Sequence, residues 1–210
     1  MIINNPKKNI LKKIKTALAK PVPMPFSETV EQNIFPQPQQ PLEIEFAENF
    51  SKLQGRFSFC ANEQELTEQL NILIETRKWT NIFCSETNLV NQLGKLPLVL
   101  QSNNLNNCHA SITSCEALVA RTGSLLLSSA IENGRTASVY APVHICIAGT
   151  SQLVFDISDA FALVKKKYGT NIPSLITLAT GPSRTADIEK TLVVGVHGPK
   201  EVFCFCYQYI

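Results

Sequence analysis

Short apolar runs alternate along the chain with longer stretches in which apolar residues recur every three or four positions. The short runs predict strands, because a buried strand needs only about four to eight residues and a helix needs more. The predicted strands lie at 81–84, 98–100, 110–112, 124–127, around Val139, and at 143–148, 175–178 and 202–207. The chain therefore carries strands along most of its length after residue 80.

The stretches with helical spacing predict the helices. Leu66, Leu70 and Ile74 share one face of a helix that ends near Lys78, and the run Asn62-Glu63-Gln64-Glu65 is a capping box at its start. Further helices are expected at 86–94, at 116–121, and from Asp156 or Ser158 to a stop at Tyr168-Gly169. Strands alternating with helices predict an α/β fold, a layered, largely parallel sheet with helices on both faces.

Length and composition narrow the class of protein. With 210 residues, 44% apolar and 17% charged, the chain is long enough for one full-sized core with an appended arm. No apolar run approaches the roughly 18 residues of a membrane-spanning helix, so no membrane span is expected. The N-terminus lacks a signal-peptide pattern, and a cytoplasmic location is expected.

The first 20 residues predict a basic amphipathic helical arm. The first 27 residues hold six lysines and no acid, which leaves a net charge of −4 on the remainder, and apolar residues recur at helical spacing: Ile10, Leu11, Ile14, Ala17 and Leu18. Such a helix could dock on its own domain or on a second copy, giving a homo-oligomer, or bind a partner or a membrane surface. Without arginines or interleaved aromatic residues in the arm, nucleic acid is not an expected partner.

Prolines separate this arm from the rest of the chain. Six of the twelve prolines fall between Pro21 and Pro41, and because proline fixes φ and lacks an amide donor, an extended linker is expected there. The predicted domains are therefore the arm at 1–20, a linker at 21–45 and one α/β domain at 46–210.

The cysteine pattern does not predict a cofactor. The chain has seven cysteines but no Cys-x-x-Cys pair and no Cys/His cluster with metal-ligand spacing. Cys204 and Cys206 would share one face of a strand, which fits either a metal site or a core, and the lack of a nearby histidine favours the core. A Gly-x-Gly-x-x-Gly dinucleotide fingerprint is also missing. No metal and no cofactor are expected.

Glycine marks the expected ligand site. Seven of the nine glycines fall at or after position 123, where strands are predicted to end, and ligands of open α/β sheets bind at the carboxyl ends of strands. In the run Thr180–Thr185, Gly181 would let the backbone approach a ligand, and Ser183 or Thr185 would cap a helix beginning near Ala186. The free amides of that helix, the two hydroxyls and the Arg184 guanidinium could together bind a carboxylate or a phosphate.

A second loop and four titratable residues complete the candidate site. Thr122, Gly123 and Ser124 repeat the combination of small hydroxyls and glycine. The candidate acids and bases are Glu116, Asp187, Glu189 and His197. A purely structural role remains an alternative throughout: Asp187 and Glu189 could complement a helix dipole or pair with Arg184, and His197 could stabilise its turn.

These residues also carry a family resemblance. The run Thr180-Gly-Pro-Ser-Arg-Thr-Ala-Asp-Ile-Glu189, followed by Gly195-Val-His-Gly-Pro199, resembles the hallmark of the lactate-utilisation C proteins, the LUD-domain family. Upstream support comes from Glu116-Ala-Leu-Val-Ala-Arg-Thr-Gly-Ser124, from Ala141-Pro142-Val-His144 and from Tyr168-Gly169. The resemblance covers roughly residues 108–205.

The resemblance implies a fold related to sugar-phosphate isomerases and CoA transferases. It also implies a role in a multi-protein system that oxidises L-lactate to pyruvate, in which companion subunits carry iron–sulfur clusters. Two functions follow from this. The chain is either a non-redox subunit that binds a small carboxylate or those iron–sulfur subunits, or a stand-alone small-molecule enzyme of the isomerase type. The sequence leaves open whether the chain has catalytic activity of its own.

Overall fold

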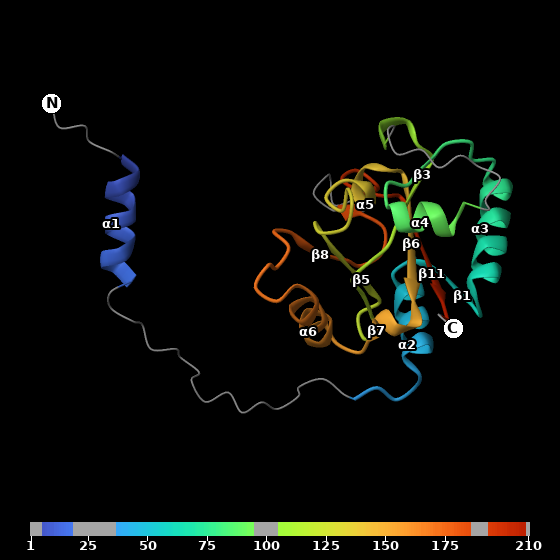
Figure 1. The fold of residues 1–210 in the computed structure, drawn as a ribbon, viewed down its shortest axis with the longest axis horizontal. Helices are drawn as coiled ribbons and strands as arrows, with labels where there is room; N and C mark the ends of the chain where they lie inside the picture. Colours follow the sequence, from blue (N-terminus) through green and yellow to red (C-terminus); the bar gives the residue numbers. More distant parts are fainter. Residues whose placement is uncertain (1–5, 19–36, 95–104, 186–192, 209–210) are drawn as a thin grey trace. The chain divides into compact units, whose positions relative to one another are not determined.

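The computed structural model describes residues 6–18, 37–94, 105–185 and 193–208, and its contacts divide the chain into two units, Met1–Gln37 and Pro38–Ile210 (Figure 1). In the first unit, helix α1 (Pro6–Leu18) leaves all its side chains exposed. Within the described residues, no helix combines the length and the apolar character that a bilayer crossing requires.

A five-stranded parallel sheet forms the centre of the second unit. Its strands lie in the order β1-β11-β6-β3-β2, and β6 and β11 are the longest, with seven residues each. The strands are β1 (Arg56–Cys60), β2 (Ile82–Phe83), β3 (Ala110–Thr113), β6 (Val143–Gly149) and β11 (Glu201–Tyr207). Because β6 and β11 pair in parallel, their amino ends lie side by side at the same end of the sheet.

A second sheet lies against one face of the first. Its order is β7-β4-β5-β8, with β4 (Ala117–Val119), β5 (Ser124–Ser128), β7 (Leu153–Val154) and β8 (Ile176–Ala179). A separate two-stranded hairpin consists of β9 (Arg184–Thr185) and β10 (Val193–Val194). The helices are α2 (Leu42–Lys52), α3 (Glu63–Arg77), α4 (Thr87–Gln92), α5 (Ala137–Tyr140) and α6 (Ile157–Tyr168), with short 3-10 turns at Leu105–Asn107 and Thr150–Gln152.

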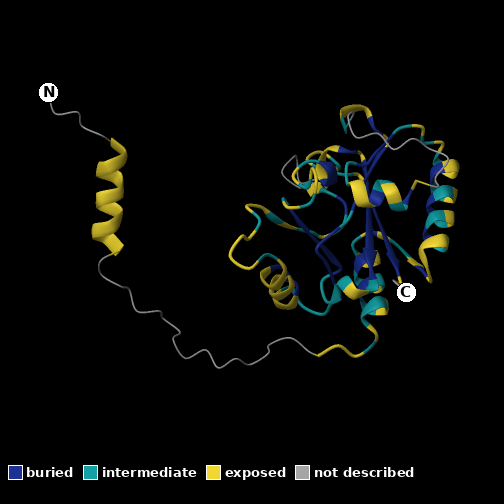
Figure 2. Ribbon diagram, in the orientation of Figure 1, coloured by how far each residue is buried: buried dark blue, intermediate teal, exposed yellow. Residues whose placement is uncertain are grey.

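Alternating side chains divide the core into layers, and Figure 2 shows the buried residues concentrated along the strands of the central sheet. Phe203, Phe205 and Tyr207 of β11 pack with α3 and α4, whereas Val202, Cys204 and Cys206 face the other way, toward α2, β4 and β5. Across the second sheet, Ala117, Val119 and Leu126 pack against α6. The order of layers is therefore α3 and α4, the parallel sheet, α2 with the second sheet, and α6. All seven cysteines are buried free thiols.

The structure confirms the α/β fold with a largely parallel sheet, and it corrects individual elements. Asn62 caps α3 by accepting a hydrogen bond from the Glu65 amide (2.9 Å), as predicted. The segment 116–121, expected to be a helix, contains strand β4, and Val139 lies in helix α5 instead of a strand. The expected strand at 98–100 lies outside the described residues. Helix α2, which the sequence did not predict, begins four residues before the expected domain boundary at 46.

Candidate functional site

The β9–β10 hairpin joins the two halves of the Thr180–Pro199 segment. Thr185 pairs with Val193 and Arg184 with Val194. The hairpin is tied to the turn before β11, because the Ser183 amide donates to the Pro199 carbonyl (2.9 Å) and the Gly195 amide donates to the Ser183 carbonyl (2.9 Å). Arg184 and Thr185 are extended strand residues, and the helix expected to begin near Ala186, with Ser183 or Thr185 as its cap, lies outside the described residues.

A cleft of about 470 Å³ opens between this turn and the segment that follows α5. One wall consists of residues 139–142, and the other consists of Gly195, Val196, His197, Gly198 and Lys200. A hydrogen bond from the Lys200 amide to the Pro142 carbonyl (2.8 Å) joins the two walls at the base. The cleft lies at the amino ends of β6 and β11, whereas the sequence had placed the ligand crevice at the carboxyl ends of strands.

Two side chains give the cleft its chemical character. The His197 and Lys200 side chains are exposed, and among the described residues no carboxylate lines the cleft. Gly195 has φ +81°, and a Cβ atom there would collide with the Lys200 stem, so glycine makes room for that stem along the cleft wall. Exposed Tyr140 adds a hydroxyl and an aromatic surface. The adjacent Glu201 is paired with Arg56 and Arg77 and is not a lining residue, so the described lysine and histidine of the cleft suit a small anion.

Gly181 and Arg184 contact the carboxyl end of α2. A Cβ atom on Gly181 would lie 2.6 Å from the Leu53 carbonyl oxygen, and the Arg184 guanidinium donates to that same oxygen. Leu53 is the residue at which α2 ends, where the helix dipole is negative and a cation is favourable. This environment explains both residues structurally and does not favour an anion beside them.

The Thr122–Ser124 loop lies beside Thr180, as expected for two parts of one site. The Ser124 hydroxyl is 2.8 Å from the Thr122 hydroxyl and 2.9 Å from the Thr180 hydroxyl. Ser124 is buried, and a Cβ atom on Gly123 would lie 2.5 Å from the Phe50 amide nitrogen of α2. Like Gly181, Gly123 therefore lets the backbone of α2 approach closely.

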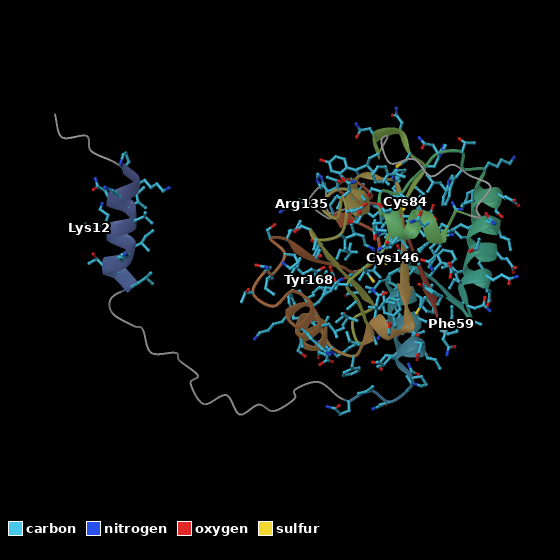
Figure 3. All side chains as sticks on the ribbon, viewed as in Figure 1. Lys12, Phe59, Cys84, Arg135, Cys146 and Tyr168 are labelled. Atoms are coloured by element: carbon cyan, nitrogen blue, oxygen red, sulfur yellow. The ribbon has the colours of Figure 1, made fainter. Side chains whose placement is uncertain are left out.

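Glu116 is a buried carboxylate with a full set of donors. Its Oε1 accepts from the Ser128 hydroxyl (2.6 Å) and the Tyr168 hydroxyl (2.7 Å), and its Oε2 accepts from Lys167 Nζ (2.8 Å). Burial by itself raises the pKa of Glu116, but the hydrogen bonds from Lys167, Ser128 and Tyr168 outweigh burial and lower it. Tyr168, at the end of α6, is labelled in Figure 3. The arrangement anchors α6 and leaves Glu116 poorly suited to accept a proton.

The remaining candidates are distributed unevenly. Asp187 and Glu189 lie outside the described residues. Ser183 and Thr185 belong to the hairpin, and only His197 among the candidate acids and bases lines the cleft within the described part of the chain. The sequence reading missed Lys200 and Tyr140, although each directly adjoins a quoted motif, Pro199 in one case and Ala141-Pro142 in the other.

Comparison with known proteins gives one family match and several relatives. The LUD domain model matches residues 101–205, half of the chain. An uncharacterised protein of Neisseria meningitidis serogroup B is 38% identical over 96 residues, which is 46% of this chain and 41% of that protein. Lactate utilization protein C of Bacillus licheniformis is 42% identical over 90 residues, which is 42% of this chain and 38% of that protein.

Lactate utilization protein C of Bacillus subtilis is 38% identical over 93 residues, covering 43% of this chain and 39% of that protein. The match thus spans about two fifths of the length of these curated relatives. Among solved structures, a DUF162 family protein from Deinococcus radiodurans superposes with a TM-score of 0.59 at 17% identity, covering 82% of this chain and 100% of that chain. That similarity supports the fold.

Proposed function

The chain belongs to the LUD domain family, and on this premise we propose that it acts as a non-redox subunit of a cytoplasmic system that oxidises L-lactate to pyruvate. In this proposal the chain binds a small carboxylate in the cleft between residues 139–142 and 195–200. The names of the Bacillus relatives support the link to lactate utilisation.

One observation carries the choice of site. Ala141-Pro142 and Gly195-Val-His-Gly-Pro199 lie more than fifty residues apart in the sequence, and both contribute to the walls of one cleft. The residue that follows the second segment is Lys200, whose position is set by the hydrogen bond from its backbone amide to the Pro142 carbonyl and by Gly195. Lys200 and His197 would bind the carboxylate, and Tyr140 would contact the rest of the molecule.

The proposal assigns electron transfer to companion iron–sulfur subunits, as the family resemblance implies. The cysteines of this chain are buried core residues, and burial raises the pKa of Cys60 to about 11 and of Cys84 to about 12, so these thiols stay protonated at neutral pH. The basic helix α1, with Ile10 and Leu18 exposed, is a candidate for docking on those subunits or on a second copy.

A calorimetric titration of the full-length chain with L-lactate, pyruvate and inorganic phosphate tests the site. We expect Lys200→Gln to weaken carboxylate binding about five- to twentyfold, because a charged hydrogen bond contributes about 1 to 2 kcal/mol at an exposed site. His197→Gln should weaken it less. Lys166→Gln, which removes an exposed cation from α6, is the matched control and should bind normally.

Two further variants separate the alternatives. If Arg184→Gln weakens binding and Lys200→Gln does not, the ligand lies at the Thr180–Thr185 loop and the cleft assignment is wrong. The stand-alone enzyme requires turnover of a sugar phosphate by the isolated chain, lost in Glu116→Gln or His197→Gln. Lactate-dependent reduction of an electron acceptor only when companion subunits are added supports the non-redox subunit.

A further inference from the structure

A second concave surface, which shares no lining residue with the cleft, lies between strand β1 and helix α3. This groove of about 380 Å³ is mostly apolar, with Ile72, Leu73, Phe203 and Phe205 on its walls and Ser58 and Thr76 beside them. Ile72 is 63% exposed, a large value for isoleucine in the middle of a helix. Neither the sequence motifs nor the proposed function uses this surface.

The groove runs beside an open sheet edge. Among the described residues, β1 pairs only with β11, so its other side presents backbone amides and carbonyls without strand partners (Figure 1). An extended peptide can satisfy such an edge by adding a strand, and apolar pockets beside the edge then select its side chains. A small molecule cannot satisfy a row of backbone groups in this way.

One end of the groove is positively charged. Arg77 donates to both carboxylate oxygens of Glu201 (3.1 and 2.8 Å), and Arg56 Nη2 lies 2.9 Å from Glu201 Oε2. Two guanidinium groups therefore share one carboxylate. The Arg56 side chain is 56% exposed and lies over the Phe203 ring, 5.3 Å from its centroid. The pair keeps an excess positive charge that faces solvent at the start of β1.

The direction of the elements decides how a peptide would lie. Strand β1 starts at Arg56, and helix α3 runs antiparallel to it. The Ser58 hydroxyl of β1 donates to the Gln69 side chain of α3, and Thr76, which comes later in α3, lies at the Arg56 end of the groove. A peptide strand antiparallel to β1 would therefore place its own carboxyl terminus beside Arg56.

We propose that this groove binds the extended C-terminal tail of a partner protein, which adds to β1 as an antiparallel strand. Alternate apolar side chains of the tail enter the groove over Ile72, Leu73 and Phe205, and the terminal carboxylate binds Arg56. A second copy of this chain fits less well, because its own β1 would bring Arg56 and Ser58, a charged and a polar residue, onto the same apolar face.

Fluorescence anisotropy with the full-length chain tests the proposal. The probe is a pool of labelled heptapeptides with Val, Ile, Leu or Phe at three alternate positions and a free C-terminal carboxylate; a second pool is amidated. We expect saturable binding of the free-acid pool, at least about tenfold tighter than the amidated pool. Arg56→Gln should remove this difference, and Ile72→Asp should abolish binding of both pools.

Matched variants outside the groove keep the test independent of folding. Ile44→Asp changes a half-exposed isoleucine on α2, and Arg135→Gln changes an exposed arginine bonded to Ser174; both should bind the free-acid pool normally. The proposal is overturned by absent saturation up to about 1 mM peptide, by equal binding of the two pools, or by binding that survives Ile72→Asp. Self-association in sedimentation that Ile72→Asp removes would assign the groove to a second copy instead.

Discussion

The buried side chain of His144 is hydrogen-bonded in its neutral form. Its side chain is 1% exposed, and its Nε2 lies 2.8 Å from the Thr113 hydroxyl. Because that hydroxyl donates its proton to the Ser114 carbonyl (2.9 Å), it accepts from His144, which fixes the neutral ring with the proton on Nε2. Burial lowers the pKa of His144 to about 4.

Stability should therefore fall as the solution is acidified. The unfolded chain takes up a proton on His144 below its ordinary pKa of 6.5, and the folded chain does so only near 4, so protonation favours unfolding between these values. We expect His144 to account for about 2 kcal/mol of stability lost between pH 7 and pH 5. Urea unfolding at both pH values measures the loss.

A histidine replacement tests this assignment. His144→Gln should flatten the dependence of stability on pH, whatever its effect on absolute stability. An unaltered slope in His144→Gln would contradict the assignment. Carboxylates with lowered pKa values, such as Glu116, affect stability mainly below the pH range of 5 to 7 that the experiment compares. The stability that they contribute is lost only as the pH falls below about 4.5.

At the scale of elements, helix α2 explains the glycine loops. Asn49 Nδ2 donates to the carbonyls of Ala120 (3.0 Å) and Arg121 (3.2 Å), and Gly123 and Gly181 let the α2 backbone approach both loops. The loops that the sequence offered as a ligand site are thus joined through a helix that the sequence did not predict.

Replacing Gly181 with alanine tests this role. Gly181→Ala forces a side chain into a backbone carbonyl at φ +81°, whereas Gly169→Ala has a similar φ of +58° with no atom within 4 Å of the new Cβ. Both variants carry a conformational cost of about 1 to 2 kcal/mol. We expect Gly181→Ala to lose about 1 to 3 kcal/mol more, measured by urea unfolding, because of the steric clash. Equal losses of stability in the two variants would contradict a close contact between α2 and Gly181.

The segment Glu116–Ser124 holds α6 at both ends. Glu116 binds Lys167 and Tyr168 at the carboxyl end of α6, and Arg121 pairs with Asp156, the N-cap, through Nε (2.9 Å) and Nη2 (3.0 Å). This motif of the family resemblance thus connects two layers of the described structure, which is a structural role.

At the scale of the whole molecule, the unit boundary lies at Pro38. A chain that begins at Pro38 retains all of α2, whereas one that begins at Phe46 loses the first turn with half-buried Leu42 and the acidic residues that favour the helix N-terminus. We expect the first chain to unfold at the same urea concentration as the full chain. The second should be less stable by about 1 to 3 kcal/mol.

Circular dichroism during urea unfolding compares the three chains, and calorimetric titration with L-lactate and pyruvate compares ligand binding by the three chains. A large loss of stability in the chain that begins at Pro38 would show that residues 1–37 contribute to the fold of the second unit.

Features that depend on neighbours along the chain were predictable from the sequence. The cap at Asn62, the end of α6 at Gly169 and the buried strands β6 and β11 were predictable, because capping residues and uninterrupted apolar runs act locally. The family motif could also be recognised in the sequence. The helix predicted at 116–121 was wrong. A short apolar segment has no clear hydrophobic periodicity, and its burial between two layers favoured a strand.

The positions of the motif residues relative to one another depend on long-range packing. The cleft exists because parallel pairing of β6 with β11 brings Pro142 beside Lys200, residues 58 positions apart. The glycine loops face α2 because a helix more than seventy residues earlier in the chain docks there. Such contacts form when layers from distant parts of the sequence pack together. The local helix and strand propensities of these residues therefore do not predict them.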